Sequence, residues 1–258
     1  MDQKPLPFEN YSTNFLLRDF AFEHSFNPVE SNTHNKMSMG GVVNKVYLLA
    51  LFTLLSSRIS WKVYNEWIST EINFVALSLI SLWLASFIGF FAFYFKSQTK
   101  FIAPFTAFFL GFSIGPLSAH LDSQFPGVVI LALILTAGIF EGILLMYQFL
   151  HRKKVDVFWI GVVGAVLGIV ILYTSVFLLN QFGLVIPFPH ELTIFLLIPL
   201  FIVLFGSIIT MIASVEFIIL QISKERTEEF EWYSAFALFI SLVWLYVDLV
   251  SYLVRRRD

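Results

Sequence analysis

Residues 126–150 read PGVVILALILTAGIFEGILLMYQFL, and Glu141 is the only charged side chain in this run. A helix of about 20 apolar residues crosses the hydrocarbon core of a bilayer, whereas a barrel strand needs only about 10. Because lipid offers backbone groups no hydrogen-bond partner, a run of this length predicts a membrane-spanning helix. The stretch therefore indicates an integral membrane protein.

The composition of the whole chain agrees with this stretch. Of the 258 residues, 58% are hydrophobic and 13% are charged, against about 25% charged in an average soluble domain. The net charge is −2 and the largest basic cluster is Arg255–Arg257, so nucleic-acid binding is excluded. There is no cysteine, which removes disulfides, thiolate metal sites and a cysteine nucleophile.

Similar apolar runs recur along the chain, each bounded by charges or turn residues. They predict an all-α membrane protein with a polar N-terminal tail at residues 1–40 and a seven-helix membrane domain at 41–258. The tail contains phenylalanines, which we expect at the membrane interface. The predicted spans are 41–61, 72–95, 101–121, 126–150, 157–182, 193–222 and 232–254.

In the first predicted span, only twelve residues separate Lys45 from Arg58. These residues cover about 18 Å at the rise of an α-helix, so the segment crosses only if both cations extend to opposite interfaces. A re-entrant or interfacial segment is the alternative.

The basic residues near the ends of the spans predict the orientation. With seven spans, nine Lys and Arg lie on the N-terminal side and five on the other, which places the N-terminus in the cytoplasm. The C-terminal triplet Arg255–Arg257 opposes this assignment. If the first segment did not cross, both termini would lie on one side.

Pairs of glycines four residues apart predict close packing between helices, because lipid gives little hydrophobic drive for helix association. The pairs are Gly111 with Gly115, Gly138 with Gly142, and Gly164 with Gly168.

Three acids lie inside the predicted spans: Glu141, Glu216 and Asp248. An ionisable group at the centre of a membrane helix costs at least ~2.5 kcal/mol, so it is expected to face the bundle interior or water. No Lys or Arg lies at a comparable depth. We expect a ladder of acids that forms a proton-sensitive cation site. The alternative is that each acid is a neutral carboxyl hydrogen-bonded to a hydroxyl or a carbonyl.

Polar side chains form a stripe on each of the last two predicted helices. Ser241 and Asp248 share a face that we expect to point inward, and Ser214 lies on the second stripe. Glu216 lies about 200° around the helix from Ser214 and is therefore off that stripe. The stripes comprise Ser234, Ser241, Asp248 and Ser251 in one helix, and Ser207, Thr210, Ser214 and Gln221 in the other.

Catalytic and metal-binding patterns are missing from the sequence. No GxSxG, HExxH, P-loop or EF-hand pattern occurs. Three histidines have a nearby acid but no third ligand, so interfacial histidines are expected rather than metal sites. We expect neither an enzyme nor a resident cofactor. The pairs are His120 with Asp122, His151 with Asp156, and His190 with Glu191.

Several stretches, taken in their order and spacing, carry a resemblance to a known family. They are Asn27–Val29, Met37–Lys45, Ala103-Pro104, Gly115–Ser118, Phe125–Val129, Thr136–Phe140, Glu231–Phe236 and Trp244–Asp248. Together they resemble the YccA-like bacterial branch of the Bax inhibitor-1 family, over roughly residues 27–253. The closing Trp-Tyr pair and the Trp-Leu-Tyr-x-acid pattern are the most specific part.

This resemblance implies a seven-helix bundle with the last helix central and a pH-sensitive calcium leak governed by acids in helices six and seven. Asp248 matches the helix-seven acid. The acid-x-acid pattern of helix six falls on Ser214-Val215-Glu216, so only its second acid is kept. An acid usual in helix three is replaced by Leu110.

The combined expectation is a slow, proton-regulated cation leak in the bacterial inner membrane. Asp248 is the central acid, Glu216 and Glu141 are its partners, and Ser214 and Ser241 belong to the pathway. Calcium, as the permeant ion, would contact Asp248 and Glu216 transiently. The alternative is an interaction protein that modulates a membrane-embedded protease or a stress response through its tail. A proton-coupled carrier is a third hypothesis.

Overall fold

A computed structural model describes residues 36–67, 74–150, 174 and 194–255 of the chain. These residues are almost entirely helical, and no strand occurs among them. Several predicted features lie outside the described residues: most of the tail, the span at 157–182, the pair Gly164 and Gly168, and the histidine sites at His151 and His190.

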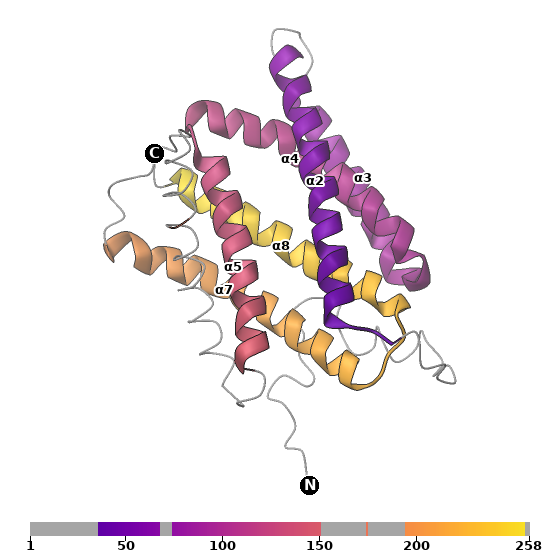
Figure 1. Cartoon of the computed structure of the whole chain (residues 1–258). Coiled ribbons are helices and arrows are strands. Elements are labelled where there is room, and N and C mark those ends of the chain that lie inside the picture. The colour runs from indigo at the N-terminus through magenta and orange to yellow at the C-terminus, as the bar shows by residue number, and fades with distance from the viewer. Residues whose placement is uncertain (1–35, 68–73, 151–173, 175–193, 256–258) are drawn as a thin grey trace. The chain divides into compact units, whose positions relative to one another are not determined.

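Each remaining predicted span coincides with a helix (Figure 1). Four helices of the described chain are long and apolar enough to cross a membrane, at Met39–Glu66, Lys96–Gln124, Val128–Leu145 and Glu229–Arg255. The full helices are α2 Met39–Trp67, α3 Phe74–Tyr94, α4 Thr99–Gln124, α5 Val128–Leu150, α7 Ile194–Ser223 and α8 Glu229–Arg255, with a short 3-10 turn, η2, at Lys96–Gln98.

Helix α2 is longer than the sequence predicts. It continues past Arg58 as one helix of 29 residues. Its last turns have one exposed side, where Lys62 pairs with Glu66 one turn further on at 3.6 Å, while Ser60 and Tyr64 are buried. A charged, solvated turn continues a helix without difficulty, because pairs four residues apart support it. A re-entrant loop would require the helix to break, and α2 does not break.

The described residues fall into two compact units. The first takes those of Met1–His120 and Ala213–Ile240, and the second those of Leu121–Ile212 and Ser241–Asp258. The core of the first unit includes the large side chains of Phe230, Tyr233, Phe236 and Phe239, all at the start of α8.

Close packing of α2 against α4 in the first unit confirms the prediction for the pair Gly111 and Gly115. A Cβ atom at Gly111 would overlap Ser56, and a Cβ atom at Gly115 would overlap Ser60. Two small residues four apart on one helix thus meet two small residues four apart on the other. Thr53 adds a hydrogen bond from its hydroxyl to the carbonyl of Ala107, at 3.1 Å.

Two further contacts join helices of the first unit. The buried Ser113 hydroxyl of α4 donates to the carbonyl of Ser78 in α3, at 2.8 Å. Near the ends of α2 and α4, the Tyr64 hydroxyl lies 3.2 Å from Nδ1 of His120. Tyr64 is thus one partner of His120.

The second unit contains α5 and the turn before it. In this turn the backbone N–H of Gly127 donates to the Asp122 carboxylate at 2.9 Å, and Gly127 has a φ of 82°, which favours glycine. Asp122 thus caps a turn. Along α5, Leu135, Ile139 and Ile143 recur every four residues and form its buried face.

Candidate functional site

The three predicted acids lie on three different helices. Glu216 of α7 belongs to the first unit, while Glu141 of α5 and Asp248 of α8 belong to the second. Each carboxylate is half-buried, and the residues beside Glu141 and Glu216 in the sequence are buried. Among the described residues, no three His, Asp or Glu side chains gather as ligands for a metal ion.

The two polar stripes differ in how deeply their members are buried. Ser214 and Gln221 of the α7 stripe are 0% and 1% exposed, whereas Thr210 of the same stripe and Glu216 are half-buried. On α8 the stripe becomes more exposed toward the C-terminus. Ser241 is buried and Asp248 half-buried, but Ser251 is exposed, so the prediction that the whole stripe points inward is wrong at its last residue.

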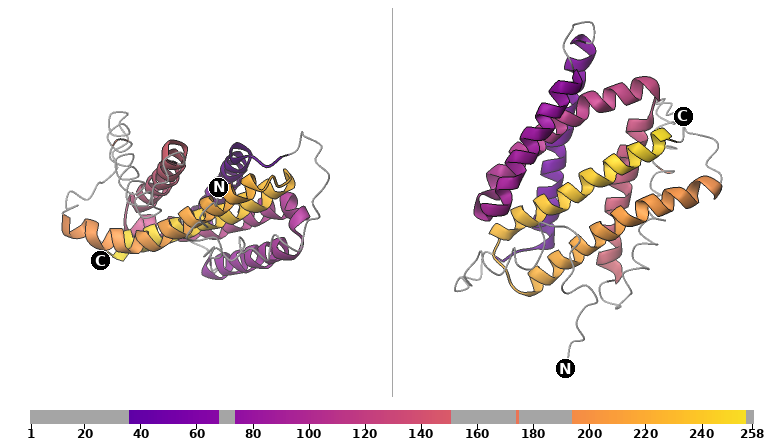
Figure 2. Two further views of the ribbon diagram at one scale, coloured as in Figure 1. Left: turned by 90° about the horizontal axis from the view of Figure 1, so that it is seen from below. Right: turned by 180° about the vertical axis from the view of Figure 1, so that it is seen from behind.

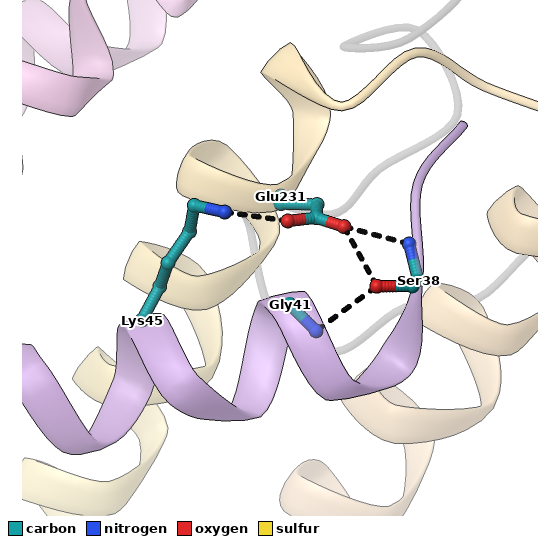
Figure 3. Close-up of polar contacts among 4 residues, drawn as sticks. All are labelled: Ser38, Gly41, Lys45 and Glu231. Carbon is teal, nitrogen blue, oxygen red and sulfur yellow. Dashed lines mark hydrogen bonds and ion pairs between the residues drawn. The ribbon is translucent and has the colours of Figure 1, made fainter. Parts of the chain in front are cut away.

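A second charged group, which the sequence analysis did not single out, lies at the start of α8. Glu231 is only 3% exposed, and its carboxylate is held by groups from the start of α2 (Figure 3). One oxygen, Oε1, accepts hydrogen bonds from the backbone N–H of Ser38 at 2.7 Å and from the Ser38 hydroxyl at 3.0 Å. The other, Oε2, lies 2.5 Å from Nζ of Lys45. We call Ser38, Gly41, Lys45 and Glu231 the latch.

The latch also caps helix α2. The Ser38 hydroxyl accepts a hydrogen bond from the backbone N–H of Gly41 at 3.0 Å, which satisfies one of the free donors of the first turn. In a capping box, a Glu three residues after the cap residue reaches back to the backbone N–H of that cap residue. Here that position is Gly41, and Glu231 from another helix supplies the carboxylate instead.

Gly41 makes this approach sterically feasible. A Cβ atom at Gly41 would overlap the Glu231 carboxylate, whereas a Cβ atom at Gly40 would meet nothing within 4 Å. The glycine is therefore needed for the contact with α8 rather than for the conformation of α2. Glu231 also lies in the first turn of its own helix, where a negative charge is favourable.

Lys45 has a partner that residue spacing does not reveal. Its side chain is only 17% exposed and pairs with Glu231. Its ammonium group also lies 5.6 Å from the centre of the Trp232 ring, within range of a cation–π interaction. A buried carboxylate and an aromatic ring compensate the ammonium group for the water that it loses.

A short strap joins the chain before the latch to the turn between α7 and α8 (Figures 1 and 2). Lys36 and Thr227 form an antiparallel bridge, and the backbone N–H of Met37 donates to the carbonyl of Arg226 at 2.8 Å. Lys36 also pairs with Glu225 at 2.9 Å, although both side chains are largely exposed. The strap and the latch together fix the start of α2 against the α7–α8 turn.

One signal in the sequence pointed to this cluster. Met37–Lys45 and Glu231–Phe236 are two of the stretches that carry the family resemblance, and the latch is the place where these two stretches meet. Residue spacing cannot find such a contact, because Lys45 and Glu231 are 186 positions apart.

The outer surfaces of the helices define the class of protein. Leu51 and Leu55 of α2 and Trp83 and Phe87 of α3 are all more than half exposed. Exposed apolar surface on this scale needs an apolar environment. Together with the long apolar helices, it identifies a multi-pass integral membrane protein.

The family follows from comparison with known proteins. The family model described as Bax inhibitor 1 like matches residues 19–258. The chain belongs to the Bax inhibitor 1 like family. Neither the curated proteins nor the solved structures that were compared include a significant match.

Proposed function

We propose that this protein permits a slow, proton-regulated leak of cations, with calcium as the transported ion. The observation that carries the proposal is the placement of Asp248, Glu216 and Glu141 in apolar helices of a Bax inhibitor 1 like protein, each half-buried. Burial of an ionisable group in such a helix costs free energy, so these acids indicate an ion pathway by default.

The chemistry of carboxylates supports this function. Calcium prefers oxygen ligands, which carboxylates, hydroxyls and carbonyls provide, and protonation of a carboxylate removes the charge that attracts the ion. Asp248 is the central acid of the proposal. Ser241 is buried two turns before it on α8 and supplies a hydroxyl to the same stripe. No catalytic step or resident cofactor is part of this function.

Glu216 has a secondary part in the proposal. It lies off the buried stripe of α7, and Ser214 occupies the position where the resemblance implies a first acid. Glu141 is the other partner of Asp248 in the proposed ladder. Asp248 and Glu141 are therefore the first acids to test.

The proposed setting is the inner membrane of a bacterium, as in the YccA-like branch, with seven spans, a central last helix and a cytoplasmic N-terminus. Contacts within the first unit support this orientation. Lys36 and Lys45 lie at the α7–α8 turn, and Lys96 of the α3–α4 turn lies 5.9 Å from the ring of Tyr233 at the start of α8. Three segments that the orientation places on the cytoplasmic side thus share one end of the unit.

The test is calcium flux into proteoliposomes at several pH values, with matched amounts of inserted protein. We expect the Asp248→Asn variant to change the pH response of the flux, and the Glu141→Gln variant to change it to a similar extent. Val247→Ala is the control, because Val247 is the exposed neighbour of Asp248. Wild-type flux no greater than that of empty liposomes would reject the leak.

A second candidate function is modulation of a membrane-embedded protease or stress factor by the tail. The strap favours it, because the chain that leaves the tail is attached to the α7–α8 turn, so a partner bound to the tail would act directly on the helices. Deletion of residues 2–35 should abolish a partner-dependent effect and leave an ion leak intact. Loss of both the partner-dependent effect and the ion leak would argue against separate roles for the tail and the membrane helices.

A further inference from the structure

Burial of the charged side chains of the latch costs free energy, which indicates a specific role for the pair. Two charges removed from water lose several kcal/mol of hydration each, and a buried ion pair often stabilises a fold no better than apolar side chains would. Here every partner of the Glu231 carboxylate is a donor: the N–H and hydroxyl of Ser38 and the ammonium group of Lys45. The carboxylate is thus fully engaged while the latch is closed.

Two buried polar groups of the α7–α8 hairpin lack hydrogen-bond partners among the described residues. The amide nitrogen Nε2 of Gln221 and the hydroxyl of Ser234 are both buried and unpaired, and their residues are 1% and 0% exposed. Ser234 follows Glu231 by three positions on α8, so the two share one face of the helix. Gln221 lies in the last turns of α7, and its side-chain oxygen accepts a 3.4 Å hydrogen bond from Arg226 of the strap.

Unpaired buried groups of this kind indicate a path for polar species. A buried polar group that stays without a hydrogen-bond partner destabilises the fold. Water, or the hydration shell of a cation, supplies the partners that the protein does not. The latch residues and these groups all belong to the first unit, at the junction of α2 with the α7–α8 hairpin.

We propose that the latch closes a polar entrance for hydrated cations, lined by Gln221 and Ser234, and that it opens when the protein conducts. Opening separates the start of α2 from Glu231, which exposes the carboxylate and the two unpaired groups to water. The proposal rests on the proposed leak and adds its entrance and its gate.

A reversible crosslink across the strap tests the gate. Lys36 and Thr227 face each other as a non-hydrogen-bonded antiparallel pair, because the bond from Met37 to Arg226 flanks them. The Cα atoms of such pairs are about 4.5 Å apart, which falls within the range that a disulfide bridges. The chain has no cysteine, so Lys36→Cys with Thr227→Cys introduces the only two thiols.

Calcium flux is measured in proteoliposomes with the double variant oxidised, and then after reduction of the same sample. We expect oxidation to lower the flux about tenfold, as when a two-state equilibrium shifts by about 1.4 kcal/mol, and reduction to restore it. Each single-cysteine variant should not respond to oxidation. As a second variant, Glu231→Gln breaks the ion pair, and its flux should exceed that of the wild type.

The outcomes separate the gate from the leak. Equal flux in the oxidised and reduced protein, with flux above empty liposomes in both, overturns the gate and leaves the leak standing. If the two thiols form no disulfide, residues 36 and 227 do not lie side by side, and the closed arrangement of the strap and the latch is overturned. No flux from the wild type or from the reduced variant overturns the proposed leak, and the gate with it.

Discussion

Breaking the ion pair between Lys45 and Glu231 should have a large and strongly non-additive effect on stability. Removing one partner of a buried pair costs about 3–5 kcal/mol, because the other charge stays buried without compensation. The side chains are 17% and 4% exposed, and Ser38 continues to stabilise the carboxylate when Lys45 is removed. We therefore expect about 3 kcal/mol for Lys45→Met and the same for Glu231→Gln.

The double variant distinguishes a true pair from two independent contacts. Lys45→Met combined with Glu231→Gln leaves no unpaired charge, and the Gln carbonyl still accepts the hydrogen bond from Ser38. The loss should stay near 3 kcal/mol rather than reach the additive value of about 6, which corresponds to an interaction energy of about 3 kcal/mol.

The assay is reversible unfolding in detergent micelles with increasing sodium dodecyl sulfate, followed by circular dichroism and tryptophan fluorescence. Trp232 lies beside the Lys45 ammonium group and contributes a local signal. Additive losses, or single variants as stable as the wild type, would refute the reasoning.

An adjacent pair of glycines provides a steric check on the same contact. Gly41→Ala places a methyl group on the Glu231 carboxylate and should destabilise the protein by about 1–3 kcal/mol, the usual range for overpacking. Gly40→Ala meets open space and should be neutral or stabilising by up to about 1 kcal/mol, because alanine favours the helix. Similar effects from both substitutions would contradict the geometry of the latch.

Three further substitutions test the contacts of α4 with α2 and α3 and use the same unfolding assay. Gly111→Ala should destabilise by at least about 1–3 kcal/mol, because its methyl group would overlap Ser56 of α2; unchanged stability would show that these helices do not touch there. Ser113→Ala should cost about 1 kcal/mol through loss of the hydrogen bond to the Ser78 carbonyl. Ser78→Ala removes an unpaired buried hydroxyl, so it should be neutral or stabilising, and a loss as large as that of Ser113→Ala would reveal a missing partner.

The membrane helices and one packing contact could be predicted from local patterns. The apolar run around Glu141 predicts a helix from its length and composition, and Gly111 with Gly115 predicts a close helix contact from its spacing. Both rules depend on residues within one segment. They succeeded because the bilayer restricts the backbone of every span in the same way.

The sequence was less informative about the exposure and the partners of individual polar side chains, because the same spacing allows a side chain to be buried or to face water. The spacing from Lys45 to Arg58 predicts that both cations reach an interface if the first segment crosses the membrane. Only the structure shows that Lys45 pairs with Glu231 and lies beside Trp232. Ser251 follows the helical spacing of its stripe but is exposed, because spacing gives the face of a helix and not how far along it the packing extends.

By itself, the sequence determined the class of protein, the positions of the described helices to within a few residues except at the end of α2, and the acids that lie inside them. Each of these depends on the balance of apolar and polar groups in one continuous segment. Only the tertiary structure decided that Glu231 forms a buried ion pair with Lys45. That pair joins residues 186 positions apart, and its stability comes from donors on α2 that meet the carboxylate only when the helices pack.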